Sequence, residues 1–462
     1  MLQNALYFFL FISTMLFLFY KTKQHLLVLF FAGLLFMAFI QWRAIPLLLL
    51  NSLFAFYLAQ KIADSTTRKN TFFILGIAAL LVQLVLFKLF VFSEQSLTGF
   101  SFESLAFTLG FSFYTLQNIA YLFDVKIGRI LPEEKALLYV VSASYFPKIL
   151  CGPVVTFQQM KKHFIATPVF KEENLIAGIN RFALGAFKKL VIADRLAPMT
   201  TAVFDSTDTF SGFTSLFAGL IFTLQVYFDF SGYVDMALGI SRMFGITLPE
   251  NFATPLGSLS ITQFWRRWHI TLMQWLTQYV YYPVSYWFRK NMFLSALFGI
   301  VITLLFSAFW HGLGLTFLLW AFCHIAYLTI ELLAQKANFK LPKAITYFLT
   351  ILAVSFANLF FRSPDFVTAK KITGEIFSLQ SFWPSDWLSQ FVAVFGRGAE
   401  LNDLFNFYLS WTFALVFLLF ENRINSRSNS EKFSVFWLAT MILLILVFGI
   451  FSGGEQFIYS RF

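Results

Sequence analysis

A histidine stands in a long stretch of the sequence that carries no formal charge. No Asp, Glu, Lys or Arg occurs from Asn291 to Ile330, and His311 lies near the middle of this stretch, in SAFWHG. About 20 apolar residues span a bilayer once, so the stretch is long enough to cross it twice. Ionisable side chains inside a bilayer are rare and usually mark a substrate path or a reacting group. His311 is therefore a candidate general base or, in a transporter, a proton relay.

Two further histidines differ in what their surroundings predict. His269 lies in FWRRWHITLMQWLTQYVYYP, residues 264–283, beside two arginines and Trp268. Taken alone, it is typical of a histidine at a membrane interface. His324 follows His311 by thirteen positions, which is about 220° around a continuous helix. The two rings would then face different directions, so we expect His324 to pack or to support a neighbouring group.

The segment QVYFDFSGYVDMALGI, residues 225–240, holds two acidic residues. Asp229 and Asp235 are six positions apart, or about 240° around a helix, so they do not form a paired acid and base. Either can hydrogen-bond or form a buried ion pair, with Arg266 or Arg267 as partner. The motifs GxSxG, HExxH, GxGxxG and the P-loop are absent from the sequence, which removes support for the common nucleophile, zinc-protease and nucleotide sites. The two cysteines lie in apolar surroundings and predict no metal site.

The composition excludes an ordinary soluble protein. Hydrophobic residues make up 58% of the chain, charged residues make up 12%, and the mean hydropathy is +0.72. Soluble domains carry about 25% charged residues. The net charge of +11 comes from short basic clusters between apolar runs, such as Lys188-Lys189 and Arg289-Lys290. Such clusters suit anchoring against anionic lipid headgroups, so we expect the lipid bilayer as a partner and no nucleic acid.

Apolar runs recur along the whole chain, which predicts an all-α polytopic membrane protein. Several runs are short, so we expect re-entrant or interfacial helices among them and about 11 true transmembrane spans. The polar interval 363–405 mixes charges with Phe and Trp and is expected to contain a surface helix. The apolar runs are 5–20, 26–42, 44–61, 71–93, 104–123, 136–152, 174–194, 211–228, 291–310, 313–332, 343–361, 406–421 and 433–451.

The interval 229–290 does not follow the spanning pattern. Its first residues are polar, and its later part, 264–283, has the pattern of an amphipathic helix at the membrane interface. Breaks in a spanning pattern are tolerated only where protein or a cavity covers the backbone, so we expect 229–290 to line a cavity. At about 100° per residue, one face of the helix would carry Trp265, Trp268, Leu272, Trp275, Leu276 and Tyr279, and Arg266 and Gln274 would lie away from it.

Three long motifs, 223–252, 264–283 and 309–324, resemble the membrane-bound O-acyltransferase (MBOAT) family, with weaker matches in 110–125, 145–154 and 187–198. The branch they resemble contains the membrane subunit of alginate O-acetylation, its peptidoglycan relative and the teichoic-acid D-alanylation protein. The resemblance implies a ring of tilted helices around a central tunnel. It also implies one membrane-embedded domain over 1–462. Within it we expect N-terminal helices in 1–100, the catalytic core in 101–335 and C-terminal helices in 336–462.

The resemblance also implies roles for individual residues. His311 matches the family's buried histidine, taken as the general base, and His269 matches the polar position of the second motif. The oxyanion formed on the acyl carbonyl needs a hydrogen-bond donor, for which His269, Arg266 and a backbone N–H are candidates. The side chains expected along the tunnel or against its substrates are Asp229, Asp235, Arg266, Arg267, Trp268 and Trp310.

The chemistry implied by this branch is acyl transfer across the bacterial inner membrane by a multi-pass protein. Cytoplasmic acetyl-CoA would be the acyl-donor substrate, and no bound cofactor is expected. A periplasmic, esterase-like partner protein would complete the transfer to a hydroxyl of peptidoglycan or of an alginate-type exopolysaccharide. The alternatives are D-alanyl transfer to teichoic acid, and a transporter or channel without enzymatic activity.

The C-terminal residues form a further candidate feature. The chain ends in GGEQFIYSRF, which contains Tyr459. This ending is similar to the termini of other chains of the branch, and to a small partner peptide of D-alanylation in which a tyrosine is regarded as an acyl carrier. Tyr459 is therefore a possible acyl carrier; the alternative is an aromatic tail anchored at the membrane interface.

Overall fold

A computed structural model of the chain describes residues 2–93, 110–206, 210–383, 385, 387–390, 401–428 and 435–451. Within these ranges the chain forms helices joined by turns and irregular segments, and it contains no strand. The prediction of an all-α polytopic membrane protein is confirmed. The helix expected within 363–405 is present as α18 (Phe366–Phe377).

Six of the described helices are long and apolar enough to cross a membrane. Three shorter apolar helices lie within α1 (Leu2–Lys21), α2 (His25–Gln41) and α22 (Val435–Phe448). The expected total of about 11 spans and the ring around a tunnel stay predictions. The six candidate spans are α3 (Ala44–Asp64), residues Lys69–Leu89 of α4 (Lys69–Ser93), α11 (Gly212–Met243), α15 (Met292–His311), α16 (Leu315–Lys336) and α17 (Lys343–Arg362).

The chain divides into two compact units. Unit 1 comprises Met1–Phe182, Ala237–Pro249 and Glu431–Phe433, and unit 2 comprises Ala183–Met236, Glu250–Ser430 and Ser434–Phe462. Helices α9 (Glu172–Phe187) and α11 contribute residues to both units. The expected single domain, with its parts divided near residues 100 and 335, stays a prediction.

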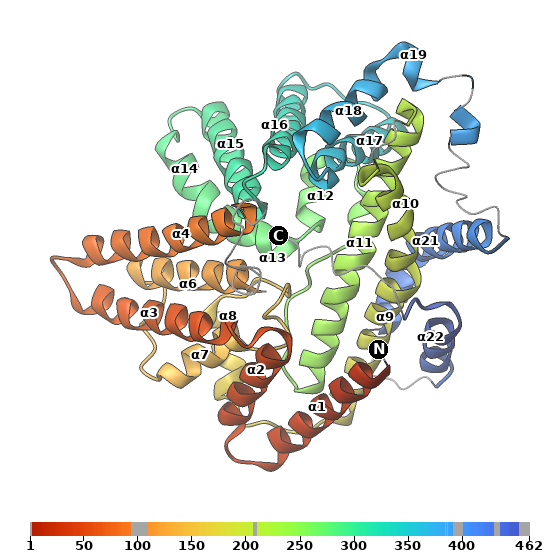
Figure 1. Ribbon diagram of the computed structural model, residues 1–462. Coiled ribbons are helices and arrows are strands. Elements are labelled where there is room, and N and C mark those ends of the chain that lie inside the picture. Colours follow the sequence, from red (N-terminus) through yellow and green to blue (C-terminus); the bar gives the residue numbers. More distant parts are fainter. Residues whose placement is uncertain are drawn as a thin grey trace. The chain divides into compact units, whose positions relative to one another are not determined.

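In unit 1, helices α3, α4 and α6 (Phe111–Lys126) pack against one another (Figure 1). Buried amides connect them: Asn51 donates to Oε1 of Gln83 over 2.7 Å, and Asn118 donates to Asn51. The Tyr139 hydroxyl donates to Oδ1 of Asn118 over 2.7 Å. Unpaired amides are costly in an apolar interior, so this network favours one packing arrangement. The unit also contains α1, α2, α7 (Ala136–Ser144), α8 (Phe157–Ile165) and the first part of α9.

Unit 2 contains most of the residues of the three long motifs. Helix α15 packs on α16, and α16 packs on α17, in a consecutive series (Figure 1). The other elements of this unit are the π-helix η1 (Lys188–Ala193), α10 (Asp194–Phe204), most of α11, the 3₁₀-helix η2 (Pro255–Gly257), α12 (Ile261–Arg267), α13 (Ile270–Leu276), the π-helix η3 (Thr277–Tyr281), α14 (Tyr282–Trp287), α18, α19 (Leu379–Phe382), α21 (Leu401–Ser428) and α22.

The polar stretch that begins at Asp229 does not interrupt the helix, contrary to expectation. Helix α11 runs for 32 residues, and Asp229 and Asp235 are buried within it. Nζ of Lys188 lies 2.6 Å from a carboxylate oxygen of Asp235, and Nζ of Lys189 lies 2.6 Å from one of Asp229 and 2.7 Å from one of Asp194. These lysines compensate the buried carboxylates, so the helix continues through the polar residues.

Candidate active site

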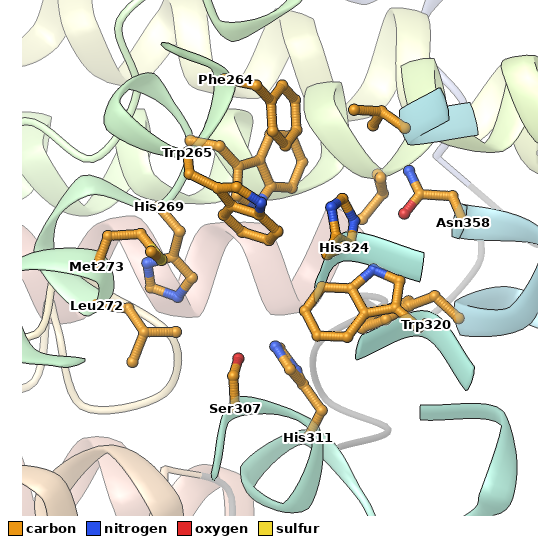
Figure 2. A pocket seen from close by; sticks show the side chains of 14 residues that line it. Phe264, Trp265, His269, Leu272, Met273, Ser307, His311, Trp320, His324 and Asn358 are labelled. Atoms are coloured by element: carbon orange, nitrogen blue, oxygen red, sulfur yellow. The ribbon is translucent and has the colours of Figure 1, made fainter. Parts of the chain in front are cut away.

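Three histidines from three segments of the chain line one small cavity in unit 2. The volume of this histidine cavity is about 30 Å³, which is room for about one water molecule. Figure 2 shows His269, His311 and His324 on three sides of the cavity, with their rings turned toward the space between them. The other lining residues are Val226, Phe264, Trp265, Trp268, Leu272, Met273, Ser307, Trp320, Val354, Asn358 and Phe361.

His311 is the last residue of α15, where the chain turns into the next helix. Gly312 has extended backbone with φ −179°, and Gly314 precedes the first residue of α16. A Cβ at Gly312 would lie 2.4 Å from Cε2 of Phe317, so a glycine here permits the close approach of that ring. His324 therefore lies on a different helix from His311. The expectation that their rings face different directions required a continuous helix, and it is wrong.

Aromatic neighbours fix the orientation of the His311 ring. Its centroid lies edge-on to Trp310 at 4.8 Å, to Trp320 at 5.6 Å and to Phe361 at 5.1 Å. Only 5% of the residue is exposed. Ser307 lies one turn earlier on α15, and its hydroxyl lies beside the His311 ring in Figure 2. The cavity therefore combines an imidazole with a nearby hydroxyl in apolar surroundings.

His269 owes its position to an interruption of the predicted amphipathic helix. Helix α12 ends at Arg267, α13 begins at Ile270, and His269 between them has a left-handed backbone with φ +45°. This conformation is uncommon for a residue with a side chain. Backbone bonds to the preceding segment replace the helical ones: Ala253 N–H donates to Arg267 O over 3.0 Å, and Ile270 N–H donates to Asn251 O over 2.9 Å. The expected single helix over 264–283 is therefore wrong.

Asn251 determines which nitrogen of His269 carries the proton. Oδ1 of Asn251 accepts from the backbone N–H of Thr271 over 3.1 Å, which identifies this atom as the oxygen of the amide. Nδ1 of His269 lies 3.2 Å from the same oxygen, so it is the donor nitrogen. His269 lies outside the candidate spans, and burial lowers its pKa to about 3. The ring is therefore neutral at pH 7, and Nε2 is its hydrogen-bond acceptor.

His324 is the cavity histidine that sequence reasoning did not place in the site. It lies on α16 and is 1% exposed, and its ring centroid is 4.9 Å from that of Trp265 and 5.1 Å from that of Trp320. Its Nδ1 has no hydrogen-bond partner within the described part of the chain. The available signal was the Gly312–Gly314 segment, which marks the break between the two helices.

A larger pocket adjoins the histidine cavity. Its volume is about 850 Å³, and Trp265 and Met273 line both spaces. These two side chains therefore form a partition between the larger pocket and the histidines. Arg266 lines the larger pocket and is not among the residues of the histidine cavity. The neutral polar side chains of the larger pocket include Thr262, Gln274, Thr277, Gln278, Thr303 and Gln335.

Two other predicted site residues, Trp268 and Trp310, lie at or near the cavity, and Arg267 is not among the residues that line it. Trp268 lines it. Trp310 packs beside two of its histidines, with its ring 6.4 Å from His269 and 4.8 Å from His311. The guanidinium of Arg267 donates to carbonyl oxygens of the loop before α12, at distances of 3.5 Å.

The remaining predicted residues lie elsewhere. Asp229 and Asp235 form the lysine ion pairs described above and are not among the residues that line the histidine cavity. Tyr459 lies outside the described residues. Within the described ranges, no cluster of three or more His, Cys, Asp or Glu side chains is arranged to hold a metal ion.

A family model and several known proteins match this chain. The family model for MBOAT, the membrane-bound O-acyltransferase family, matches residues 137–361, which include all three histidines. The peptidoglycan O-acetyltransferase of Helicobacter pylori is 32% identical over 74% of this chain and 71% of its own length. The probable alginate O-acetylase of Azotobacter vinelandii is 31% identical over 83% of this chain and 79% of its own length. The teichoic acid D-alanyltransferase of Bacillus subtilis is 25% identical over 50% of this chain and 60% of its own length. The chain belongs to the membrane-bound O-acyltransferase family and is an O-acyltransferase.

Proposed function

We propose that the chain transfers acetyl groups from acetyl-CoA toward hydroxyls of a cell-envelope polysaccharide. The names of two relatives support this: one is a peptidoglycan O-acetyltransferase, and the other is a probable alginate O-acetylase. The D-alanyltransferase relative is less similar and matches a shorter part of the chain. This difference favours acetyl over D-alanyl as the acyl group, and peptidoglycan and an alginate-type polysaccharide are the two candidate acceptors.

The observation that carries the proposal is the His311 ring, which lies at a small, apolar cavity beside two further imidazoles. In the proposed reaction, His311 takes the proton of the acceptor hydroxyl as its oxygen attacks the thioester carbonyl. The new C–O bond forms and the C–S bond breaks. The thiolate leaves and takes the proton from His311, so the imidazole returns to its neutral form.

His269 has a different role in this proposal. Because its Nδ1 donates to Asn251, its Nε2 can accept a hydrogen bond from a substrate hydroxyl or amide. His269 would then orient the acceptor or the thioester arm, and it would not serve as the donor to the oxyanion.

The acetyl group must also leave the membrane protein. We propose an inner-membrane location with acetyl-CoA on the cytoplasmic side and an esterase-like partner protein on the periplasmic side. The chain lacks a GxSxG nucleophile motif, which is consistent with completion of the transfer by another protein. Either Tyr459 carries the acetyl group in between, or a hydroxyl of the partner accepts it directly.

The test is to incubate the purified protein with acetyl-CoA and to follow free thiol and intact mass. The variants are His311→Ala, Tyr459→Phe and, as a control outside the cavity, His163→Ala. Thiol release with an added acetyl group, both lost in His311→Ala and Tyr459→Phe, supports a relay through Tyr459. If thiol release is lost in His311→Ala but not in Tyr459→Phe, the hydroxyl that accepts the acetyl group belongs to the partner protein. Absence of thiol release by the wild type, with the partner supplied, contradicts the proposal.

A further inference from the structure

The thioester carbonyl gains negative charge during the attack, and the surrounding protein must present a hydrogen-bond donor to it. His269 is not suited to this role, because its proton lies on Nδ1 and is directed to Asn251. Arg266 lines the larger pocket and not the histidine cavity. The backbone N–H of Gly312, which directly follows His311, already donates to Ala308 O over 2.9 Å. The His269 N–H and the Gly312 N–H are therefore directed elsewhere, and Arg266 faces the larger pocket.

His324 has the properties that such a donor requires. A neutral imidazole has one N–H donor, and the His324 ring faces the same cavity as His311 (Figure 2). Its Nδ1 has no hydrogen-bond partner among the described residues, although the side chain is almost fully buried. Burying an unsatisfied polar atom lowers stability, and such an atom in a native structure calls for an explanation, such as a catalytic role.

The ring of His324 is also held in place before a substrate binds. Trp265 and Trp320 contact it edge-on at 4.9 and 5.1 Å, and Tyr327 contacts it at 5.8 Å. A donor that is already oriented needs no reorganisation when charge develops on the carbonyl oxygen. Trp320 also contacts the His311 ring at 5.6 Å, so one indole positions both imidazoles.

We propose that His324 is a second catalytic residue, whose ring N–H donates a hydrogen bond to the carbonyl oxygen of the acyl group. The inference rests on the proposed acyl transfer. His311 accepts the hydroxyl proton, the C–O bond forms, and the carbonyl oxygen becomes an oxyanion that His324 stabilises. When the C–S bond breaks, the carbonyl reforms and the thiolate takes the proton from His311, so His324 keeps its own proton throughout.

The experiment compares three variants in thiol release from acetyl-CoA, with wild type and His311→Ala in parallel. His324→Phe keeps a ring but removes the donor, and His324→Gln keeps a donor but removes the ring. Tyr327→Phe is the control, because its ring contacts His324 but does not line the cavity. We expect kcat of His324→Phe to fall by about 100- to 1,000-fold with little change in KM, because an oxyanion donor acts in the transition state.

We expect His324→Gln to keep at least about a tenth of the wild-type kcat, because its amide N–H replaces the donor. The pH profile of either variant should keep its position, because the base His311 is unchanged. The proposal is overturned if His324→Phe keeps kcat within about threefold of wild type, or if its KM rises at unchanged kcat. If His324→Phe does not fold, the test rests on His324→Gln. Thiol release by His324→Gln as low as that by His311→Ala would then overturn the proposal. Absence of turnover in the wild type would instead count against the proposed function itself.

Discussion

Two groups of buried polar side chains in unit 2 are built in opposite ways. In the ion-pair cluster, Lys188 pairs with Asp235 and Lys189 pairs with both Asp229 and Asp194, at distances of 2.6 to 2.7 Å. In the histidine cavity, three imidazoles face a shared space of about 30 Å³. The first group directs its charges to one another, and the second turns its imidazole rings toward a shared cavity. Burial alone therefore does not identify a reacting group.

The two groups also differ in what a substitution should change. Removing one member of a buried ion pair leaves the other charge uncompensated, so the expected effect is on folding. Removing a ring that faces a cavity leaves a hole or an absent hydrogen bond, so the expected effect is mainly on the reaction. The predictions below test this separation.

The largest effect is expected for His311→Ala. Loss of a general base should lower kcat/KM for thiol release from acetyl-CoA by about 1,000- to 10,000-fold. The measurement is thiol release by equal amounts of folded wild type and variant. Activity of the variant within about tenfold of wild type would remove His311 from the role of base.

A large loss of stability is expected for Lys188→Met. Lys188 and Asp235 are each 3% exposed in their side chains, and an uncompensated Asp235 should lower the free energy of unfolding by about 3–5 kcal/mol. Thermal unfolding of the detergent-solubilised protein measures the effect. The double variant Lys188→Met/Asp235→Leu should recover most of the loss, because Asp235 is then not left as a buried charge without Lys188. Equal instability of the double and single variants would contradict the ion-pair account.

The pH dependence of stability should distinguish the histidine cavity from the ion pairs. The pKa of His269 is about 3 in the folded chain, whereas the ordinary pKa of a histidine side chain is 6.5, so between these values the unfolded state binds the extra proton. Its contribution to stability is therefore complete above pH 6.5 and falls by up to about 1.4 kcal/mol for each pH unit below it. We measure the free energy of unfolding of wild type and of His269→Gln from pH 7.5 to 5. The difference between them should fall with decreasing pH by about 1 kcal/mol for each pH unit below 6.5. A pH-independent difference would contradict a buried, neutral His269.

The smallest effect is expected at an ion pair near the surface. Arg362 and Asp205 form two hydrogen bonds of 3.0 and 2.8 Å, but the Asp205 side chain is 40% exposed. Solvent screens such a pair, so Asp205→Asn should lower the free energy of unfolding by less than about 1 kcal/mol. Thermal unfolding alongside Lys188→Met gives the comparison. A loss of unfolding free energy as large as that of Lys188→Met would show that burial does not determine how strongly a broken ion pair destabilises the protein.

The sequence predicted the helices of this protein better than the breaks between them. Hydropathy located α15 and α16 on either side of Gly312, because long uncharged runs must be helical in a bilayer. The break at His269 left no trace in the periodicity, because the apolar positions of 264–283 fit one helix. It depends on backbone bonds to Asn251 and Ala253, and such contacts require knowledge of the tertiary structure.

The same limit applies to the site. The long motifs and the uncharged surroundings of His311 identified it as a candidate base. The placement of His324 was missed because the angular argument assumed one helix from residue 311 onward. The lysine partners of Asp229 and Asp235 lie more than thirty residues earlier in the sequence, where spacing gives no guidance. Residues brought together by tertiary packing were therefore the ones that could not be predicted.

The most direct test of the separation between the two polar groups is thiol release per folded molecule in His311→Ala and Lys188→Met. Both variants are measured at a temperature at which Lys188→Met is still folded, with the melting temperature of each sample recorded. We predict that His311→Ala melts close to wild type but releases almost no thiol, whereas Lys188→Met melts earlier and keeps most of its activity per folded molecule. Full activity in folded His311→Ala, or an inactive but stable Lys188→Met, would contradict the assignment of catalysis to the histidine cavity.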